Sequence, residues 1–136
     1  MAAGVDGDCG RTVSIWNRLQ EGGVFRWLLS LFQRTPIGSR PRSSQWPKVR
    51  AEHLRRYPEC AACGCDTDLE VHHIIPYHVD PSMELNFENL MTLCGDKASD
   101  CHRRIGHGFN WTLWNDQVIR DAAWFRSMLR RVRKGR

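Results

Sequence analysis

The chain has 136 residues, 41% of them hydrophobic and 26% charged, which suits one folded domain with a short appendage. No apolar run approaches the ~20 residues that cross a bilayer, and the N-terminus lacks the basic and apolar parts of a secretory signal, so we expect a cytoplasmic protein without a membrane partner. Outside a secretory route, the six cysteines favour metal ligation over disulfides.

Charge is distributed unevenly along the chain, whose net charge is +5. Residues 34–56 hold seven basic residues and one acidic residue, whereas residues 57–101 hold nine acidic residues and one lysine. Residues 118–136 again hold seven basic residues and one acidic residue, and five of the six cysteines fall in the acidic middle. This arrangement favours a protein that holds a cation centrally and binds nucleic acid with its flanks.

The N-terminal third predicts helices followed by a linker. Two short helical stretches are expected within residues 11–33, and the second contains an apolar run at 24–32. We expect this run to form a helix that packs on the domain or on a protein partner, with attachment to a membrane surface as the alternative. Three prolines then predict a linker. The expected organisation is an N-terminal helical segment at 1–34, a Pro/Arg-rich linker at 35–47 and a domain at 48–136.

The domain predicts mixed α and β elements. We expect a helix from Lys48 to about Arg56, a strand at 69–75 and a second apolar stretch at 89–93. A short helix is expected at 101–107 and a basic helix at 115–134, with Asn115 as its N-cap. The side chains expected in the core after the short helix are Trp111, Trp114, Val118, Ala122, Phe125, Leu129 and Val132.

Two pairs of cysteines predict a structural zinc site. Cys60 and Cys63 are separated by two residues, and Cys94 and Cys101 by six. Four sulfur ligands brought together by a fold are typical of structural zinc, and metal binding then stabilises a small core. Cys65 is an alternative ligand to Cys63, and ordinary buried or redox-active thiols are the alternative to a metal site.

Four of the six histidines lie near these cysteines in the sequence. His72 and His73 fall on the expected strand, and His102 and His107 follow Cys101. Two adjacent histidines can divide labour, because one can bind a metal through a neutral nitrogen while the other accepts a proton near pH 7.

Taken in order, these segments resemble an HNH endonuclease of the zinc-stapled kind. The resemblance covers about residues 57–108 and depends on the two cysteine pairs, on LEVHHIIP at 69–76, on ENLMTLC at 88–94 and on CHRR at 101–104. It implies an α+β fold with a small ββα-metal core, in which a hairpin, a loop and a helix surround one divalent cation. A structural zinc site and flanking N- and C-terminal helices complete the expected architecture.

The resemblance also implies roles for individual residues. His73 corresponds to the general base that activates water, and Asn89 to the residue that fixes the loop and orients the base, with Asn86 as an alternative. The implied ligands of the catalytic metal are His72, His102 and, if the helix geometry allows, His107. The implied zinc ligands are Cys60, Cys63, Cys94 and Cys101.

The implied activity is hydrolysis of DNA phosphodiester bonds, with one structural Zn²⁺ and one catalytic Mg²⁺, Mn²⁺, Ni²⁺ or Zn²⁺. Imidazole ligands favour the softer of these ions. A zinc-stapled nucleic-acid-binding module without catalysis is the alternative, and an interaction protein that docks through its N-terminal helix is a third. By analogy, we expect a small phage or bacterial nuclease. The basic residues expected to contact DNA, with a solvated surface as the alternative, are Arg42, Lys48, Arg50, Arg103, Arg104 and Arg130.

Overall fold

The computed structural model describes residues 33–34, 41–97 and 99–135. The helices expected within residues 11–33, including the apolar run at 24–32, lie outside these ranges, apart from Gln33. Gln33–Arg34 forms a short strand, β1, rather than the end of a helix. It pairs antiparallel with β4 (Leu113–Trp114), so these two residues lie against the C-terminal part of the chain.

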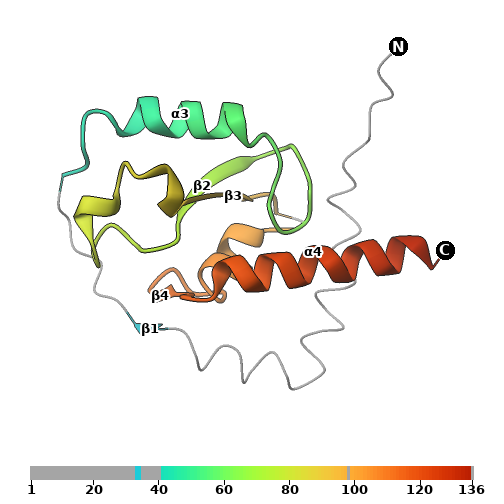
Figure 1. Cartoon of the computed structure of the whole chain (residues 1–136). Coiled ribbons are helices and arrows are strands. Elements are labelled where there is room, and N and C mark those ends of the chain that lie inside the picture. The colour runs from blue at the N-terminus through green and yellow to red at the C-terminus, as the bar shows by residue number, and fades with distance from the viewer. Residues whose placement is uncertain (1–32, 35–40, 98, 136) are drawn as a thin grey trace, which may run out of the picture.

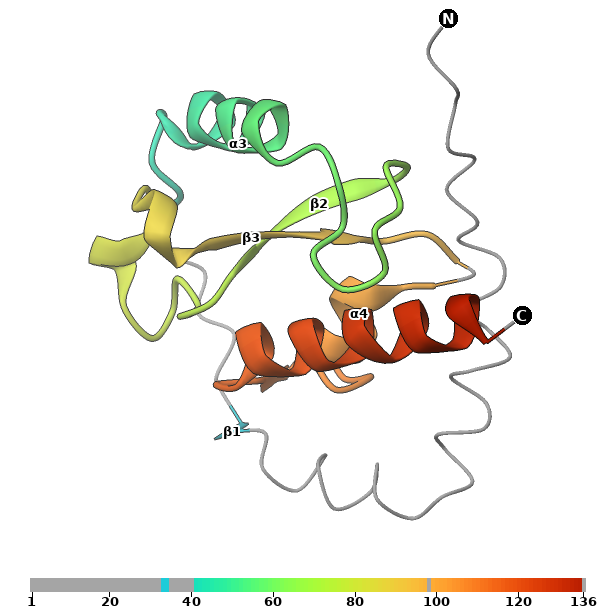
Figure 2. The ribbon, with the colours of Figure 1, turned by 45° about the vertical axis from the view of Figure 1, so that its right-hand side comes forward.

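The centre of the fold is an antiparallel hairpin of β2 (Leu69–His73) and β3 (Leu90–Cys94). Helix α3 (Trp46–Arg56) lies on one side of this hairpin, and helix α4 (Val118–Lys134) lies on the other (Figures 1 and 2). The short helix η4 (His102–Gly106) contacts β2, β3 and α4. Two single turns, η2 (Pro81–Met83) and η3 (Phe87–Asn89), lie in the loop between the strands. The α+β fold class is therefore confirmed.

Helix α3 begins at Trp46, two residues before the expected start at Lys48. Pro47 occupies the first turn, where its missing N–H costs nothing, so a proline-containing segment can still begin a helix. The helix buries His53 against the rest of the fold, with ring centroids 4.8 Å from Tyr57 and 5.8 Å from Phe87.

Helix α4 begins at Val118 rather than just after Asn115. Asn115 is buried, and its side chain accepts a hydrogen bond from the Gln117 amide and donates to the Ile105 carbonyl. It therefore shapes the turn before the helix instead of capping it. Val132 is 41% exposed, so its expected place in the core is wrong. The other residues of the apolar stripe are buried: Val118, Ala122, Phe125 and Leu129.

Within the described ranges, no helix has the length and apolar character needed to cross a membrane.

Candidate metal centre and active site

Four cysteines form a buried group at one end of the hairpin. The sulfur atoms of Cys60, Cys63, Cys94 and Cys101 all lie within 4.8 Å of one another, and those of Cys63 and Cys94 are 3.6 Å apart. A zinc ion with Zn–S bonds of about 2.3 Å in a tetrahedron would separate its sulfur ligands by roughly 3.8 Å. The donor set and its spacing therefore fit a structural zinc ion. Cys65 lies outside this group, although its sulfur is 3.4 Å from that of Cys63.

Hydrogen bonds within the turn, and others from β3 and α4, hold the turn that carries the first cysteine pair. The Cys60 amide donates to the Cys65 carbonyl at 2.7 Å, and Gly64 has the positive φ of 80° that this tight turn requires. The Ala61 amide donates to the carbonyl of Thr92 in β3, two residues before Cys94. From α4, Arg126 donates to the Cys60 carbonyl and pairs with Glu59.

Full ionisation of the sulfur group would require a compensating cation. Hydrogen bonding from Cys101 lowers the pKa of Cys63 to about 5, whereas hydrogen bonding with Cys60 raises the pKa of Cys101 above its usual range. Ionising all four thiols would place four negative charges in one buried cluster, and only a cation could compensate them.

The two adjacent histidines at the end of β2 point in different directions, because successive side chains of a strand project to opposite faces. His72 faces η4, where its ring lies edge-on to that of His102 with centroids 5.1 Å apart. His73 faces α3, where its ring lies 4.6 Å from that of Trp46. Because of the pleat of β2, the His72 ring lies among the residues of η4 and the His73 ring lies against α3.

On the η4 side, three imidazole rings form a triangle. The centroids of His72, His102 and His107 are each 5.1 Å from the other two, and their nearest ring nitrogens lie within 4.8 Å. In a regular α-helix, residues five positions apart point about 140° away from each other. Here the turn at His102–Gly106 is a π-helix, whose i to i+5 repeat brings His102 and His107 to the same face.

The hydrogen bonds of His102 and His107 leave one ring nitrogen of each for a metal. His102 Nδ1 contacts the carboxylate of Glu70, and His107 Nδ1 donates to the Leu113 carbonyl at 2.9 Å. Both contacts direct Nε2 toward the triangle, which is the usual arrangement of metal-binding histidines. His72 Nε2 is buried and has no hydrogen-bond partner among the described residues. A divalent ion bound by the three Nε2 atoms would satisfy it, so the donor set fits Zn²⁺, Ni²⁺ or Mn²⁺.

Burial favours the neutral form of two of these imidazoles, those of His72 and His107. It holds the pKa of His72 well below the ordinary value, and the neighbouring histidines lower it further. Burial also lowers the pKa of His107. Neutral imidazole is the form that binds a metal.

His73 is oriented by a backbone carbonyl. Its Nε2 lies 3.0 Å from the carbonyl oxygen of Glu84, and a carbonyl only accepts hydrogen bonds, so Nε2 carries the proton. Nδ1 is then the nitrogen that can accept one. His73 is 8% exposed, and burial lowers its pKa.

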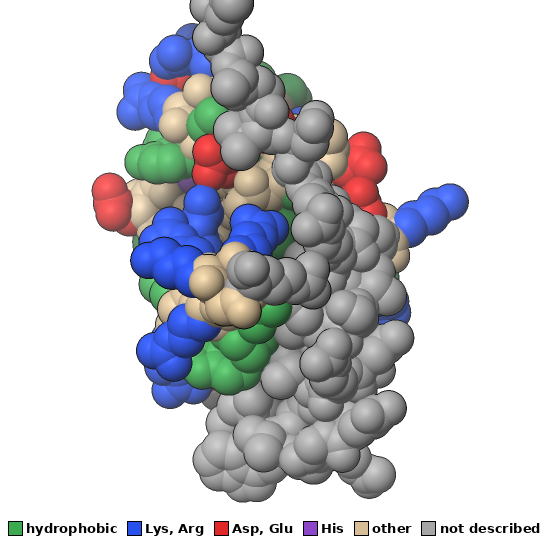
Figure 3. Space-filling view, turned by 90° about the vertical axis from the view of Figure 1, so that its right-hand side faces the viewer, with side chains coloured by type: hydrophobic (Ala, Val, Ile, Leu, Met, Phe, Trp, Pro, Cys, Tyr) green, Lys and Arg blue, Asp and Glu red, His purple; other side chains and the backbone are tan. Residues whose placement is uncertain are grey.

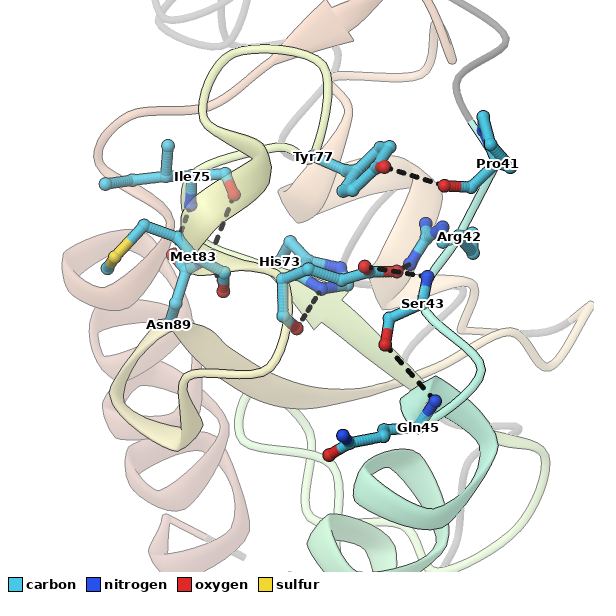
Figure 4. A network of polar contacts seen from close by, with 10 residues as sticks. Pro41, Arg42, Ser43, Gln45, His73, Ile75, Tyr77, Met83 and Asn89 are labelled. Carbon is cyan, nitrogen blue, oxygen red and sulfur yellow. Dashed lines mark hydrogen bonds and ion pairs between the residues drawn. The ribbon is translucent and has the colours of Figure 1, made fainter.

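The segment before α3 binds the side chain of Glu84, whose backbone carbonyl contacts His73. The buried Glu84 carboxylate accepts a hydrogen bond from the Ser43 amide at 3.0 Å and pairs with Arg42 at 3.6 Å. Arg42 in turn lies over the rings of Trp46 and Tyr77. Figure 4 shows Arg42, Ser43 and Tyr77 close to His73. Arg42, expected to contact DNA, therefore also has a structural role.

Asn89 ties both ends of the loop between the strands. Its side-chain oxygen accepts from the Ile75 amide at 2.7 Å, and its nitrogen donates to the carbonyls of Ile75 and Met83 (Figure 4). These bonds end β2 at His73, short of the expected Ile75, because Ile75 pairs with a side chain instead of a strand. The alternative residue, Asn86, is exposed and caps η3 by accepting from the Glu88 amide.

The family model for HNH endonucleases matches residues 60–108. This segment is an HNH domain. The match spans the cysteine group, both strands and η4, and it confirms the family that the sequence resembles. No curated protein and no solved structure matches the chain.

The basic residues expected to contact DNA differ in their exposure and in their contacts. Lys48 and Arg50 are exposed on α3, and Arg130 is exposed on α4. Arg103 pairs with Asp100 at 2.6 Å, and burial lowers the pKa of Arg104. Viewed toward the end of α4, Lys and Arg side chains gather around that helix end (Figure 3).

Several residues that support the site were not predicted from the sequence. Glu70, Glu84, Trp46 and Arg126 each contact a candidate ligand, the candidate base or the cysteine turn across long sequence separations. Only for Glu70 was a signal present, because its position two residues before His72 places both side chains on the same face of β2.

Proposed function

We propose that this protein is an endonuclease that hydrolyses DNA phosphodiester bonds with a single divalent metal bound by His72, His102 and His107. The observation that carries the proposal is the imidazole triangle, in which Nε2 of each ring is the nitrogen left for a metal, beside an oriented His73 that neighbours His72 on β2. A module that only binds nucleic acid needs the zinc staple but neither of these features.

In this mechanism, His73 Nδ1 accepts the proton of a water molecule whose oxygen attacks phosphorus, and the bond to the 3′ oxygen breaks. When bound, the divalent ion would stabilise the charge that develops on the phosphate and the leaving oxygen. The Glu84 carbonyl keeps the proton of His73 on Nε2, and Trp46 restricts the ring from the α3 side. Asn89 holds the loop that carries Glu84 at a constant distance from β2.

Conversion of supercoiled plasmid to nicked or linear DNA tests the proposal. We expect cleavage with added Mn²⁺, Ni²⁺, Zn²⁺ or Mg²⁺, and we expect EDTA to stop it. His73→Ala should abolish cleavage while the protein keeps its fold and both metals. Plasmid binding without cleavage under every metal would contradict the proposal and favour a binding module. Full activity of His73→Ala would refute the assignment of the base.

A matched pair of asparagine variants tests the loop. Asn89→Ala removes three hydrogen bonds of a buried side chain and should lower kcat strongly. Asn86→Ala removes one exposed cap and should have little effect. Equal losses in the two variants would show that Asn89 has no special role.

A further inference from the structure

Trp111 stands in solvent beside the imidazole triangle. Its side chain was expected in the core, but it is 53% exposed, so that prediction is wrong. Its ring centroid lies 4.8 Å from that of His107 and 5.3 Å from that of His102. A large aromatic surface is therefore open to solvent at the edge of the candidate metal site.

The turn that carries Trp111 is well braced. The Asn110 side chain accepts hydrogen bonds from the amide and hydroxyl of Thr112, at 3.0 and 2.8 Å. The Asn110 amide donates to the His107 carbonyl, and the Leu113 amide donates back to Asn110. The Leu113 carbonyl accepts from His107 Nδ1. The indole is thus presented on a turn built directly on one of the candidate ligands, which reduces the entropy lost when it binds a ligand.

We propose that Trp111 stacks on an unpaired nucleobase next to the phosphate that is cleaved. The proposal rests on the proposed function, because that function places a phosphate at the triangle and hence a base one sugar away from it. Inside a duplex both faces of a base are covered by its neighbours, so stacking on Trp111 requires a base that has left the stack. The preferred substrate is then single-stranded DNA, or duplex DNA with a distorted or open step.

Binding measurements in a cleavage-deficient background test this proposal. All variants carry His73→Ala in the full chain, and fluorescence anisotropy compares a labelled oligothymidylate with a blunt duplex of the same length in the presence of Mn²⁺. Loss of one stacking contact should weaken oligothymidylate binding by about 5- to 100-fold in Trp111→Leu. Trp111→Phe should retain most of the affinity because it keeps an aromatic face. Duplex binding should change much less.

Trp124 provides the matched control, since it is also 53% exposed but lies on α4. Trp124→Leu should leave oligothymidylate binding unchanged. Equal losses in the two leucine variants, equal losses on single strand and duplex, or a phenylalanine variant as weak as the leucine variant would each overturn stacking. Loss of bound metal in Trp111→Leu would also overturn it, because the indole would then only protect the histidines.

The outcomes separate this inference from the proposed function. If the unsubstituted protein cleaves plasmid but Trp111→Leu binds the oligothymidylate normally, the endonuclease proposal stands and stacking is refuted. If no cleavage occurs but Trp111→Leu loses single-strand binding selectively, the endonuclease proposal fails, and stacking on an unpaired base stands without a cleaved phosphate beside it.

Discussion

Gly106 is the position where the smallest change should damage the candidate metal site. It lies in the π-helical turn, and a Cβ atom there would be 2.8 Å from Cε1 and 2.9 Å from Nδ1 of His72. Carbon atoms in good contact are about 3.5–4.0 Å apart, so Gly106→Ala requires a shift of roughly 0.7 Å or more. His72 is 3% exposed and belongs to the hairpin, so little free space is available for that shift.

Gly106→Ala should change folding stability only slightly, so metal affinity is the quantity to measure. Overpacking costs about 1–3 kcal/mol, whereas alanine stabilises a helix by ~1 kcal/mol relative to glycine. The net loss of folding stability is therefore about 0–2 kcal/mol, and the fold should survive. A displaced His72 ring should lower affinity for the catalytic metal by about tenfold or more, since even indirect disturbance of a ligand costs roughly 10- to 100-fold.

Calorimetric titration of the zinc-loaded protein with Ni²⁺ measures this affinity, and metal analysis confirms that the cysteine site stays filled. Gly135→Ala is the control, because its Cβ would meet only the Arg131 carbonyl at an ordinary 3.6 Å. If Gly106→Ala bound Ni²⁺ as tightly as the control, the inferred position of His72 in the ligand set would be refuted.

Three further predictions concern residues that form or support the two sites, and a fourth concerns the pH dependence of folding stability. Cys94→Ser should lose zinc and unfold at a lower temperature, whereas Cys65→Ser should keep zinc; retention of zinc by both would refute the four-cysteine site. Glu70→Gln should weaken catalytic metal binding by about 10- to 100-fold without loss of zinc, and unchanged affinity would exclude a role in holding His102. Trp46→Ala should lower kcat with little change in metal content, which plasmid cleavage and metal analysis check together; an unaltered kcat would show that His73 needs no support from α3. Burial lowers the pKa of His53, so its neutral form stabilises the fold fully above its ordinary pKa near 6.5, and this contribution is lost as pH falls toward the folded pKa. Urea unfolding should therefore show a smaller loss of stability between neutral and mildly acid pH in His53→Phe than in the unsubstituted protein, and identical pH dependence would contradict the argument.

In the hairpin, the sequence pattern predicts where strands form but not where they end. The β-branched run before Pro76 predicts a strand, the run before Cys94 was predicted as an apolar stretch, and both form strands. Their ends were not predictable, because Asn89 competes with the strand for the Ile75 amide through a contact across 14 positions. In the same way, no local signal shows that Glu84 contacts both His73 and the segment before α3.

The sequence by itself indicated the family, placed four histidines close to the cysteines along the chain, and made His72 and His73 neighbours. Residue type and spacing carry this information because a metal needs particular donor atoms and a strand alternates its faces. Only the tertiary structure decided which ring nitrogens face inward, that Cys65 lies outside the cysteine group and that His107 joins His102. His107 lies beside His102 because η4 is a π-turn, whereas a regular α-helix would point the two side chains about 140° apart. The turn packs against β2, β3 and α4, and the local sequence pattern does not encode these tertiary contacts.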